Sequence, residues 1–177
     1  RTREDSAKGI EYVKQALELE PGFALAWVLL SVAYSGEADS GWIPTDVGYS
    51  RAREAVERAL ALEPDLAEAH ARMGYIKLSF DWDWKSAEEY IQRALELAPD
   101  NVFVLRVAAR LARGTGDIET ALDRIRSSLE SDPLNSGGYA NFGVVLHSAG
   151  RLAEADEAYR KALEVAPQAI AVHAHFS

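Results

Sequence analysis

The chain has 177 residues, of which 48% are hydrophobic, and a formal net charge of -9. That hydrophobic fraction is ordinary for a globular protein and argues against disorder. The acidic balance disfavours a general binder of nucleic acid or of anionic membranes, because both require a basic surface. The absence of cysteine excludes a disulfide framework, a thiolate zinc site and a cysteine nucleophile.

The sequence also indicates where the protein is expected to reside. No apolar run reaches the length of a membrane span, and no signal peptide is visible. Because the lack of cysteine fits a reducing compartment, we expect a cytoplasmic protein. The chain starts at Arg1 without a methionine, so we expect an upstream segment.

Five prolines divide the chain at intervals of 43, 35, 34 and 34 residues. They close five similar phrases, QALELEP, RALALEP, RALELAP, SSLESDP and KALEVAP, at Pro21, Pro64, Pro99, Pro133 and Pro167. A proline at such a point ends a helix, since its ring cannot continue one. A fixed period of this size indicates a helical repeat array.

In chain order, residues 5–19 are predicted to form the second helix of a half repeat. Four full repeats, each a pair of helices, are predicted to follow at 24–64, 67–99, 102–133 and 136–167. The first of them carries an insertion near 37–46, and residues 169–177 are predicted to begin a further helix. Together they form a single array over residues 1–177, which we expect to be part of a longer one. Since no segment alternates like a strand, we expect an all-α fold.

Small residues recur at fixed places in these repeats, which indicates close helix packing. One such column holds Ser31, Gly74, Ala109 and Gly143. Within the last full repeat, apolar residues follow the i, i+3, i+4, i+7, i+8 spacing of one buried helical stripe. This stripe contains Ala155, Ala158, Tyr159, Ala162 and Leu163.

The last full repeat also carries a family resemblance. Its residues at the expected spacing are Tyr139, Phe142, Gly143, Leu146, Ala155, Tyr159, Ala162 and Pro167. This pattern resembles the tetratricopeptide repeat (TPR), and four units of the chain share it. The resemblance implies a right-handed superhelical solenoid of antiparallel helix pairs, with a concave groove lined by the first helix of each pair. It further implies a scaffold that binds a partner protein or peptide.

The second full repeat contains the phrase FDWDWKSAEEY in its central turn. With the long repeat before it, this turn is similar to TPR segments of bacterial signalling proteins, notably class III adenylate cyclases and winged-helix regulators. The resemblance implies an alternative function, that of an intramolecular regulatory or dimerisation module in a larger protein.

A basic row is the strongest candidate for a binding site. Arg106, Arg110 and Arg113 have i, i+4, i+7 spacing and share one face of a predicted helix. By the resemblance this face lines the groove, together with Arg72, Tyr75, Asn141, Val144, Val28 and Val32. Guanidinium groups match carboxylates in geometry, so the row predicts a partner with an acidic segment. The alternative is that these arginines pair with glutamates across the groove.

Two tryptophans are candidates for recognition outside the groove. Trp42 lies in the insertion and Trp82 in the DWDW turn, and each can serve either as an interface anchor or as ordinary packing. Trp84 falls where a helix begins, and we expect it to pack into the core.

No catalytic, cofactor or metal site emerges from the sequence, so we expect that the chain is not an enzyme. The histidines lack metal-ligand spacing, and the close carboxylate pairs are typical of solvated helix faces. The glycine-bearing stretches at 114–117 and 136–138 follow no strand and lack the lysine of a phosphate-binding loop.

Overall fold

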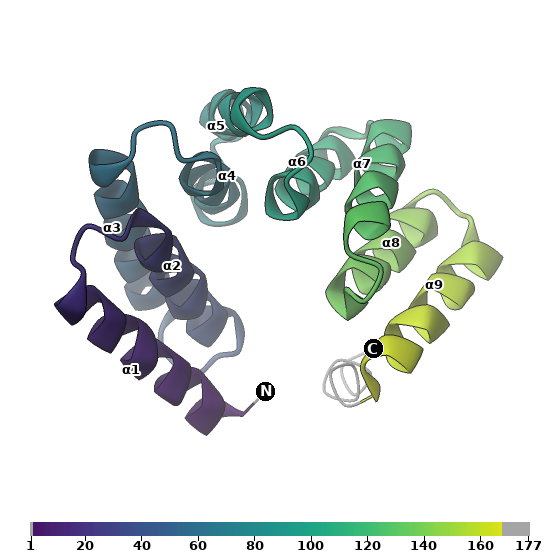
Figure 1. Ribbon diagram of the computed structural model, residues 1–177. Coiled ribbons are helices and arrows are strands. Elements are labelled where there is room, and N and C mark those ends of the chain that lie inside the picture. The colour runs from purple at the N-terminus through teal and green to yellow at the C-terminus, as the bar shows by residue number, and fades with distance from the viewer. Residues whose placement is uncertain (1, 168–177) are drawn as a thin grey trace. The chain divides into compact units, whose positions relative to one another are not determined.

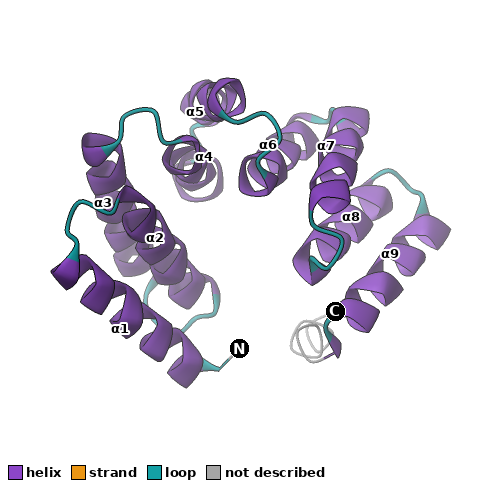
Figure 2. Ribbon diagram, viewed as in Figure 1, coloured by secondary structure: helices purple, strands orange, loops and turns teal. Residues whose placement is uncertain are grey.

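A computed structural model of the chain describes residues 2–167, which contain helices and turns and no strand (Figure 2). The predicted all-α class is thereby confirmed. Internal contacts divide the chain into two compact units, Arg1–Ala98 and Pro99–Ser177, and each is described by itself. The helix predicted to begin at 169–177 lies outside the described residues.

Unit 1 contains five α-helices and one π-helical segment in the described residues (Figure 1). They are α1 (Arg3–Leu19), α2 (Ala24–Asp39), α3 (Thr45–Leu62), α4 (Ala67–Ile76), η1 (Lys77–Asp81) and α5 (Trp84–Leu97). Each packs against the next along the chain, with α2 against α3 and α4 against α5 as hairpins. The first helix begins before residue 5 because Thr2 caps it: the Thr2 hydroxyl accepts from the Asp5 amide, and the Asp5 carboxylate accepts from the Thr2 amide.

The insertion predicted near 37–46 lengthens two helices. Helix α2 has 16 residues and α3 has 18, whereas the helices of unit 2 have 13 or 14. The turn between α2 and α3 is therefore short, and Gly41 adopts its left-handed backbone conformation with φ of 70°. The extra residues thus extend the contact between the two helices.

The segment η1 accounts for the 35-residue spacing of the second full repeat. A π-helical turn accommodates one more residue than an α-helical turn, so the helix absorbs a single extra residue without losing its buried face. The chain then reverses at Trp82, and Asp83 caps α5 by accepting a hydrogen bond from the Ser86 amide at 3.2 Å.

Unit 2 contains α6 (Val102–Thr115), α7 (Ile118–Ser131), α8 (Ser136–Ser148) and α9 (Leu152–Val165) in the described residues. Asn101, Asp117 and Asn135 cap the first three of these helices through side-chain oxygens that accept backbone N–H groups. Helices α6 and α7 form one hairpin and α8 and α9 the next, and α7 packs against α8.

The small-residue column lies where paired helices approach most closely. A Cβ atom on Gly74 would come within 2.6 Å of the Ile91 side chain, and one on Gly143 within 2.5 Å of the Tyr159 ring. These distances leave no room for any side chain and confirm the expectation of close packing. Fully buried residues such as Ile76 in unit 1 and Leu146 in unit 2 fill the core on either side.

Candidate functional site

Helix α6 presents the predicted arginine row of unit 2. The Asn101 side chain caps the helix by accepting hydrogen bonds from the amides of Phe103 and Val104. The start of the helix determines which face each later residue of α6 occupies. Arg106 is half-buried, Arg110 is exposed and Arg113 lies half-exposed in the last turn. A cation in the last turn also interacts favourably with the negative end of the helix dipole.

Arg106 is the most constrained member of this row. Its Nε atom is buried and has no hydrogen-bond partner in the described part of the chain. Burial lowers the pKa of Arg106, and the charge of Asp132 opposes that shift. A buried donor without an acceptor is costly, so Arg106 is the member of the row with an unsatisfied polar atom.

Asn141 and Val144, also predicted to be contacts, are both exposed on α8. They lie one helical turn apart, so they share a face. Their orientation is set from the other side of the helix, where Gly143 packs directly against the Tyr159 ring. Helix α8 thus offers an amide and an apolar side chain on one surface.

Arg72 lies in the interior of unit 1, which corrects its prediction as an open contact residue. It is 3% exposed, and its Nε donates to the Ser31 hydroxyl at 2.9 Å. One terminal nitrogen donates to the Ser31 carbonyl at 3.0 Å and also to the Ser35 hydroxyl. Burial lowers the pKa of Arg72 to about 10, and the nearby Tyr75 opposes the shift. Arg72 therefore joins α4 to α2 instead of facing a ligand.

Tyr75 is half-buried, because its ring lies against the Arg72 guanidinium at 4.7 Å. Next to it, Tyr49 donates to the Asp39 carboxylate at 2.8 Å. Burial, above all, raises the pKa of Tyr49 well beyond its ordinary range. These polar groups form an internal network that connects α2, α3 and α4.

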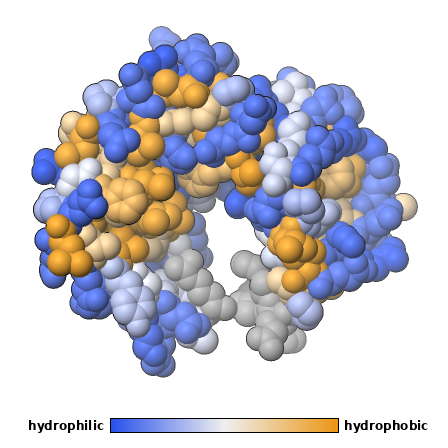
Figure 3. All heavy atoms as spheres, viewed as in Figure 1, coloured by the Kyte–Doolittle hydropathy of each residue, from blue (hydrophilic) through white to orange (hydrophobic). Residues whose placement is uncertain are grey.

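The apolar residues exposed on α2 are not all those that were predicted, which were Val28 and Val32. Val28 is buried, whereas Leu25 is 36% exposed and Leu29 is 51% exposed. With Val32 they form an i, i+4, i+7 row, and Figure 3 shows hydrophobic residues gathered over α2. Trp27 and Leu30 face the core. Taking these two residues as the buried face of the helix would have identified the row from the sequence.

The two candidate tryptophans have different environments. Trp42 is half-buried in the turn after α2, and its amide donates to the Glu37 carbonyl. Trp82 is 72% exposed. Trp84 was expected in the core, but it is 39% exposed because it occupies the first position of α5.

Several acidic side chains of the described residues form hydrogen bonds and ion pairs within the fold. Residues 2–167 hold no group of three His, Cys, Asp or Glu side chains able to bind a metal ion. The carboxyl groups with a shifted pKa there all shift downward, each because hydrogen bonds stabilise its charged form: Asp5, Asp81, Asp83 and Glu154. In the same range no helix has the length and apolar character needed to cross a membrane.

Comparison with known proteins identifies the repeat. Residues 106–170 match the tetratricopeptide repeat family. Over 85 residues the chain is 33% identical to the small glutamine-rich tetratricopeptide repeat-containing protein 2 of Mycosarcoma maydis. That alignment covers 48% of this chain and 24% of the relative, so the chain spans about a quarter of the relative's length.

Solved structures agree on the fold. The structure of pilF from Pseudomonas aeruginosa has a TM-score of 0.65 and 22% identity, and the match covers 84% of this chain and 64% of that one. YrrB, described as a TPR protein with an unusual peptide-binding site, has a TM-score of 0.58 and 22% identity, with 97% and 84% covered. Residues 106–170 therefore resemble tetratricopeptide repeats, and the described residues share the all-helical fold of these structures.

Proposed function

We propose that this chain is a protein-interaction scaffold and that the α6 face of unit 2 binds an acidic peptide segment of its partner. TPR proteins generally act as scaffolds that bind proteins or peptides. The observation that carries the proposal is the arginine row, in which the half-buried Arg106 keeps a buried Nε donor without an acceptor.

The alternative, in which the row is neutralised by neighbouring glutamates, has less support. Neither Arg106 nor Arg113 makes an ion pair within residues 2–167. Other arginines of these residues do form ion pairs, as Arg53 does with Asp81 and Arg151 with Glu154. A row of cations on an otherwise acidic chain attracts an acidic segment by long-range charge and can bind each carboxylate in two-point geometry.

Asn141 and Val144 supply the other contacts expected of a peptide site. An exposed amide can both donate to and accept from a peptide backbone, and an exposed valine offers apolar area. Because α6 and α8 are the first helices of successive repeats, the TPR resemblance places their faces on the same side. YrrB, described as having a peptide-binding site, supports the assignment by fold likeness.

Unit 1 offers a second contact of different chemistry. The row on α2 formed by the exposed Leu25 and Leu29 and the half-buried Val32 is apolar and suits the hydrophobic side of a partner helix or segment. We propose that Tyr75, whose position beside Arg72 is fixed, contributes there in place of the buried arginine.

The test is affinity capture with the native chain and with an Arg106→Glu, Arg110→Glu, Arg113→Glu variant. The bound proteins are identified, and peptides from their acidic segments are titrated by fluorescence anisotropy. The reversed row should lose binding, and added salt should weaken binding to the native chain because it screens charges. An Arg→Lys version of the same three positions should bind more weakly than the native chain, because lysine lacks the planar fork.

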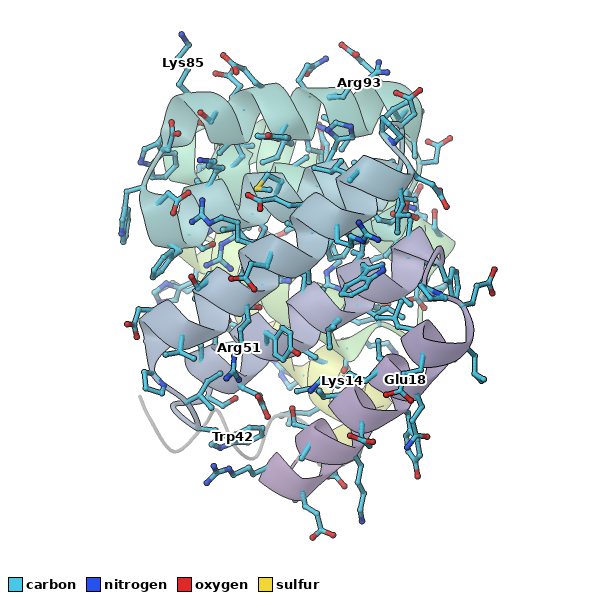
Figure 4. All side chains as sticks on the ribbon, turned by 90° about the vertical axis from the view of Figure 1, so that its left-hand side faces the viewer. Lys14, Glu18, Trp42, Arg51, Lys85 and Arg93 are labelled. Carbon is cyan, nitrogen blue, oxygen red and sulfur yellow. The ribbon has the colours of Figure 1, made fainter. Side chains whose placement is uncertain are left out.

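A matched control carries the same change of charge elsewhere. Arg3, Lys14 and Arg58 are exposed in unit 1, and Figure 4 shows Lys14 on α1. Reversing these three should leave binding intact, with circular dichroism verifying that both variants are folded. Equal binding by the two triple variants would refute the arginine row as the site.

The alternative function, a regulatory or dimerisation module of a larger bacterial signalling protein, rests on the DWDW turn and the long first repeat. The full-length gene decides between the two: a cyclase or DNA-binding domain encoded with the repeats supports regulation, and repeats alone support the scaffold.

A further inference from the structure

The turn before α5 differs from the other hairpin turns at one backbone position. Gly41, Gly116 and Gly150 adopt the left-handed conformation in the turns after α2, α6 and α8, with φ of 70°, 86° and 73°. Before α5 this conformation belongs to Trp82, with φ of 56°, the one non-glycine residue with positive φ in residues 2–167. Glycine adopts it freely, whereas a side chain is disfavoured there. The fold of the hairpin therefore does not account for an indole.

The surrounding turn holds Trp82 outward and fixes its position. The amides of Trp82 and Asp83 both donate to the Lys77 carbonyl. Asp81 accepts two hydrogen bonds from Arg53, at 2.5 and 3.0 Å, and lies 3.2 Å from the Lys77 ammonium. With its backbone held by these bonds and its ring 72% exposed, Trp82 presents an indole to solvent, which suits an interface anchor.

A pocket of about 530 Å³ in unit 2 has the chemistry to receive such a ring. It lies between α8 and α9. Its apolar lining consists of Tyr139, Phe142, Leu146 and Ala158, and its charged lining consists of Glu154, Glu157, Arg160, Lys161 and Glu164. Aromatic rings favour stacking with an indole, and a carboxylate can accept its N–H.

The charges around the tryptophan and around the pocket are complementary. At the start of α5 the exposed residues at i, i+3 and i+4 are positive, negative and negative: Lys85, Glu88 and Glu89. On α9 the same spacing carries negative, positive and positive: Glu157, Arg160 and Lys161. Figure 4 shows Lys85 pointing away from the body of unit 1, and neither Lys85 nor Glu157 makes an ion pair within the described residues.

These patterns fit one register. If α5 of one copy lies parallel to α9 of another with Lys85 opposite Glu157, the following two positions also meet opposite charges. Trp82 lies in the turn just before α5, at the same end of this contact as Glu154, which precedes Glu157 by one helical turn and is part of the pocket lining.

We propose that the chain associates with a second copy of itself through this contact, with Trp82 of one copy inserted into the α8–α9 pocket of the other. The two faces differ, so in a complex of two copies one copy keeps an unused pocket and the other an unused Trp82, and a further copy can bind at either end. The contact uses neither the arginine row nor the α2 row, so it stands independently of the proposed function.

Sedimentation velocity over a concentration series tests the proposal. The native chain should form dimers and larger species as concentration rises, and added salt should reduce them. Trp82→Gly matches the other hairpin turns, so it should fold with an unchanged or higher melting temperature. It should nevertheless weaken association about 30-fold, the loss expected for a buried anchor residue. A native chain that stays monomeric, or a glycine variant that associates equally well, overturns the proposal.

Charge exchange tests the register. Lys85→Glu and Glu157→Lys should each weaken association, and a chain carrying both should regain it, because the opposed pair is restored with its signs exchanged. Mixing a Trp82→Gly chain with a Glu157→Lys chain should give a one-to-one complex and nothing larger, since each variant keeps only one working face. Failure of the double variant to recover association counts against this register and overturns the proposed contact.

Discussion

Gly48 on α3 is expected to tolerate no side chain, although it lies inside a helix where alanine is normally preferred. An added Cβ would come within 2.5 Å of the Ala38 Cβ and 2.9 Å of the Tyr34 carbonyl oxygen. Neither atom belongs to the end of a flexible side chain, so α2 and α3 would have to separate. Gly36 on α2 is the matched control, because a Cβ there meets nothing within 4 Å.

The magnitude follows from two opposing terms. Replacing glycine by alanine within a helix stabilises by about 1 kcal/mol in both variants. Overpacking a close contact costs roughly 1–3 kcal/mol, and contacts to backbone-proximal atoms place Gly48 at the upper end. We therefore expect Gly36→Ala to stabilise the protein by about 1 kcal/mol and Gly48→Ala to destabilise it by about 2 kcal/mol.

Urea unfolding monitored by circular dichroism measures both variants against the native chain. Because repeat stability is largely a sum of local and neighbour terms, hydrogen exchange of the α2 and α3 amides should report the loss most directly. A Gly48→Ala variant as stable as Gly36→Ala would show that the α2–α3 contact is looser than the distances above indicate, and would refute the close-packing account of the long hairpin.

Three further predictions follow from the described contacts. Hydrogen bonds from Arg53, and then Lys77, hold the pKa of Asp81 below its ordinary value of 3.8, so its stabilisation is present above that pH and lost as pH falls through the lowered pKa. Asp81→Asn should therefore lower the free energy of unfolding by about 1–2 kcal/mol at pH 7, and in urea titrations the two proteins should approach equal stability as the pH falls through the lowered pKa of Asp81. Asn101→Ala removes the α6 cap and should cost about 1 kcal/mol, visible as faster hydrogen exchange in the first turn of α6, whereas unchanged exchange would contradict the cap. Arg72→Met keeps a similar side-chain volume and removes the buried charge. Its free energy of unfolding, measured by thermal denaturation, should therefore stay within about 1 kcal/mol of the native value. Arg72→Ala leaves a cavity and should cost about 3 kcal/mol, and equal losses in the two would contradict the packing role of that side chain.

The prolines and small residues were sufficient to predict the helix pairs. A proline limits the helix before it, and a spacing between prolines that recurs near 34 residues sets how much chain most pairs contain. Glycines at 74 and 143 then identify which faces meet, because only a missing side chain permits the approach seen to Ile91 and Tyr159. Both features depend on residues within a single repeat, so they can be interpreted from the sequence without knowing how the repeats pack on one another.

Features that depend on two repeats at once were harder to predict. Arg72 carries a charge on the first helix of its repeat, which favours exposure when the helix is considered alone. Its burial depends on hydroxyl groups from the preceding repeat, at Ser31 and Ser35. The signal was present in the sequence: Ser31 supplies the one hydroxyl in a column otherwise made of glycine and alanine. A buried donor needs an acceptor, so a hydroxyl in a tight column indicates a polar partner.

The insertion shows a second limit. The number of extra residues between two helices does not show whether they lengthen the loop or the helices. Which of the two occurs depends on whether the added residues can pack against the rest of the protein. Tyr49 in the extended part of α3 stacks on Phe80 at 4.7 Å and bonds Asp39, so the added turns bury apolar area and satisfy a hydroxyl. A loop of the same length would gain neither and would cost more conformational entropy.

Both proposals rest on residues that the fold itself does not explain. Trp82 is the one non-glycine residue with positive φ in residues 2–167, and Arg106 is among the residues there with a buried side-chain atom that lacks a hydrogen-bond partner. A residue whose type conflicts with what the fold favours at its position is a candidate for a functional role, because sequence and fold otherwise tend to agree. The two differ in chemistry as well: one depends on a fixed aromatic ring and the other on a row of cations. Substitution of either should therefore leave the other interaction intact, and a single variant that abolished both would indicate loss of folding instead of loss of a site.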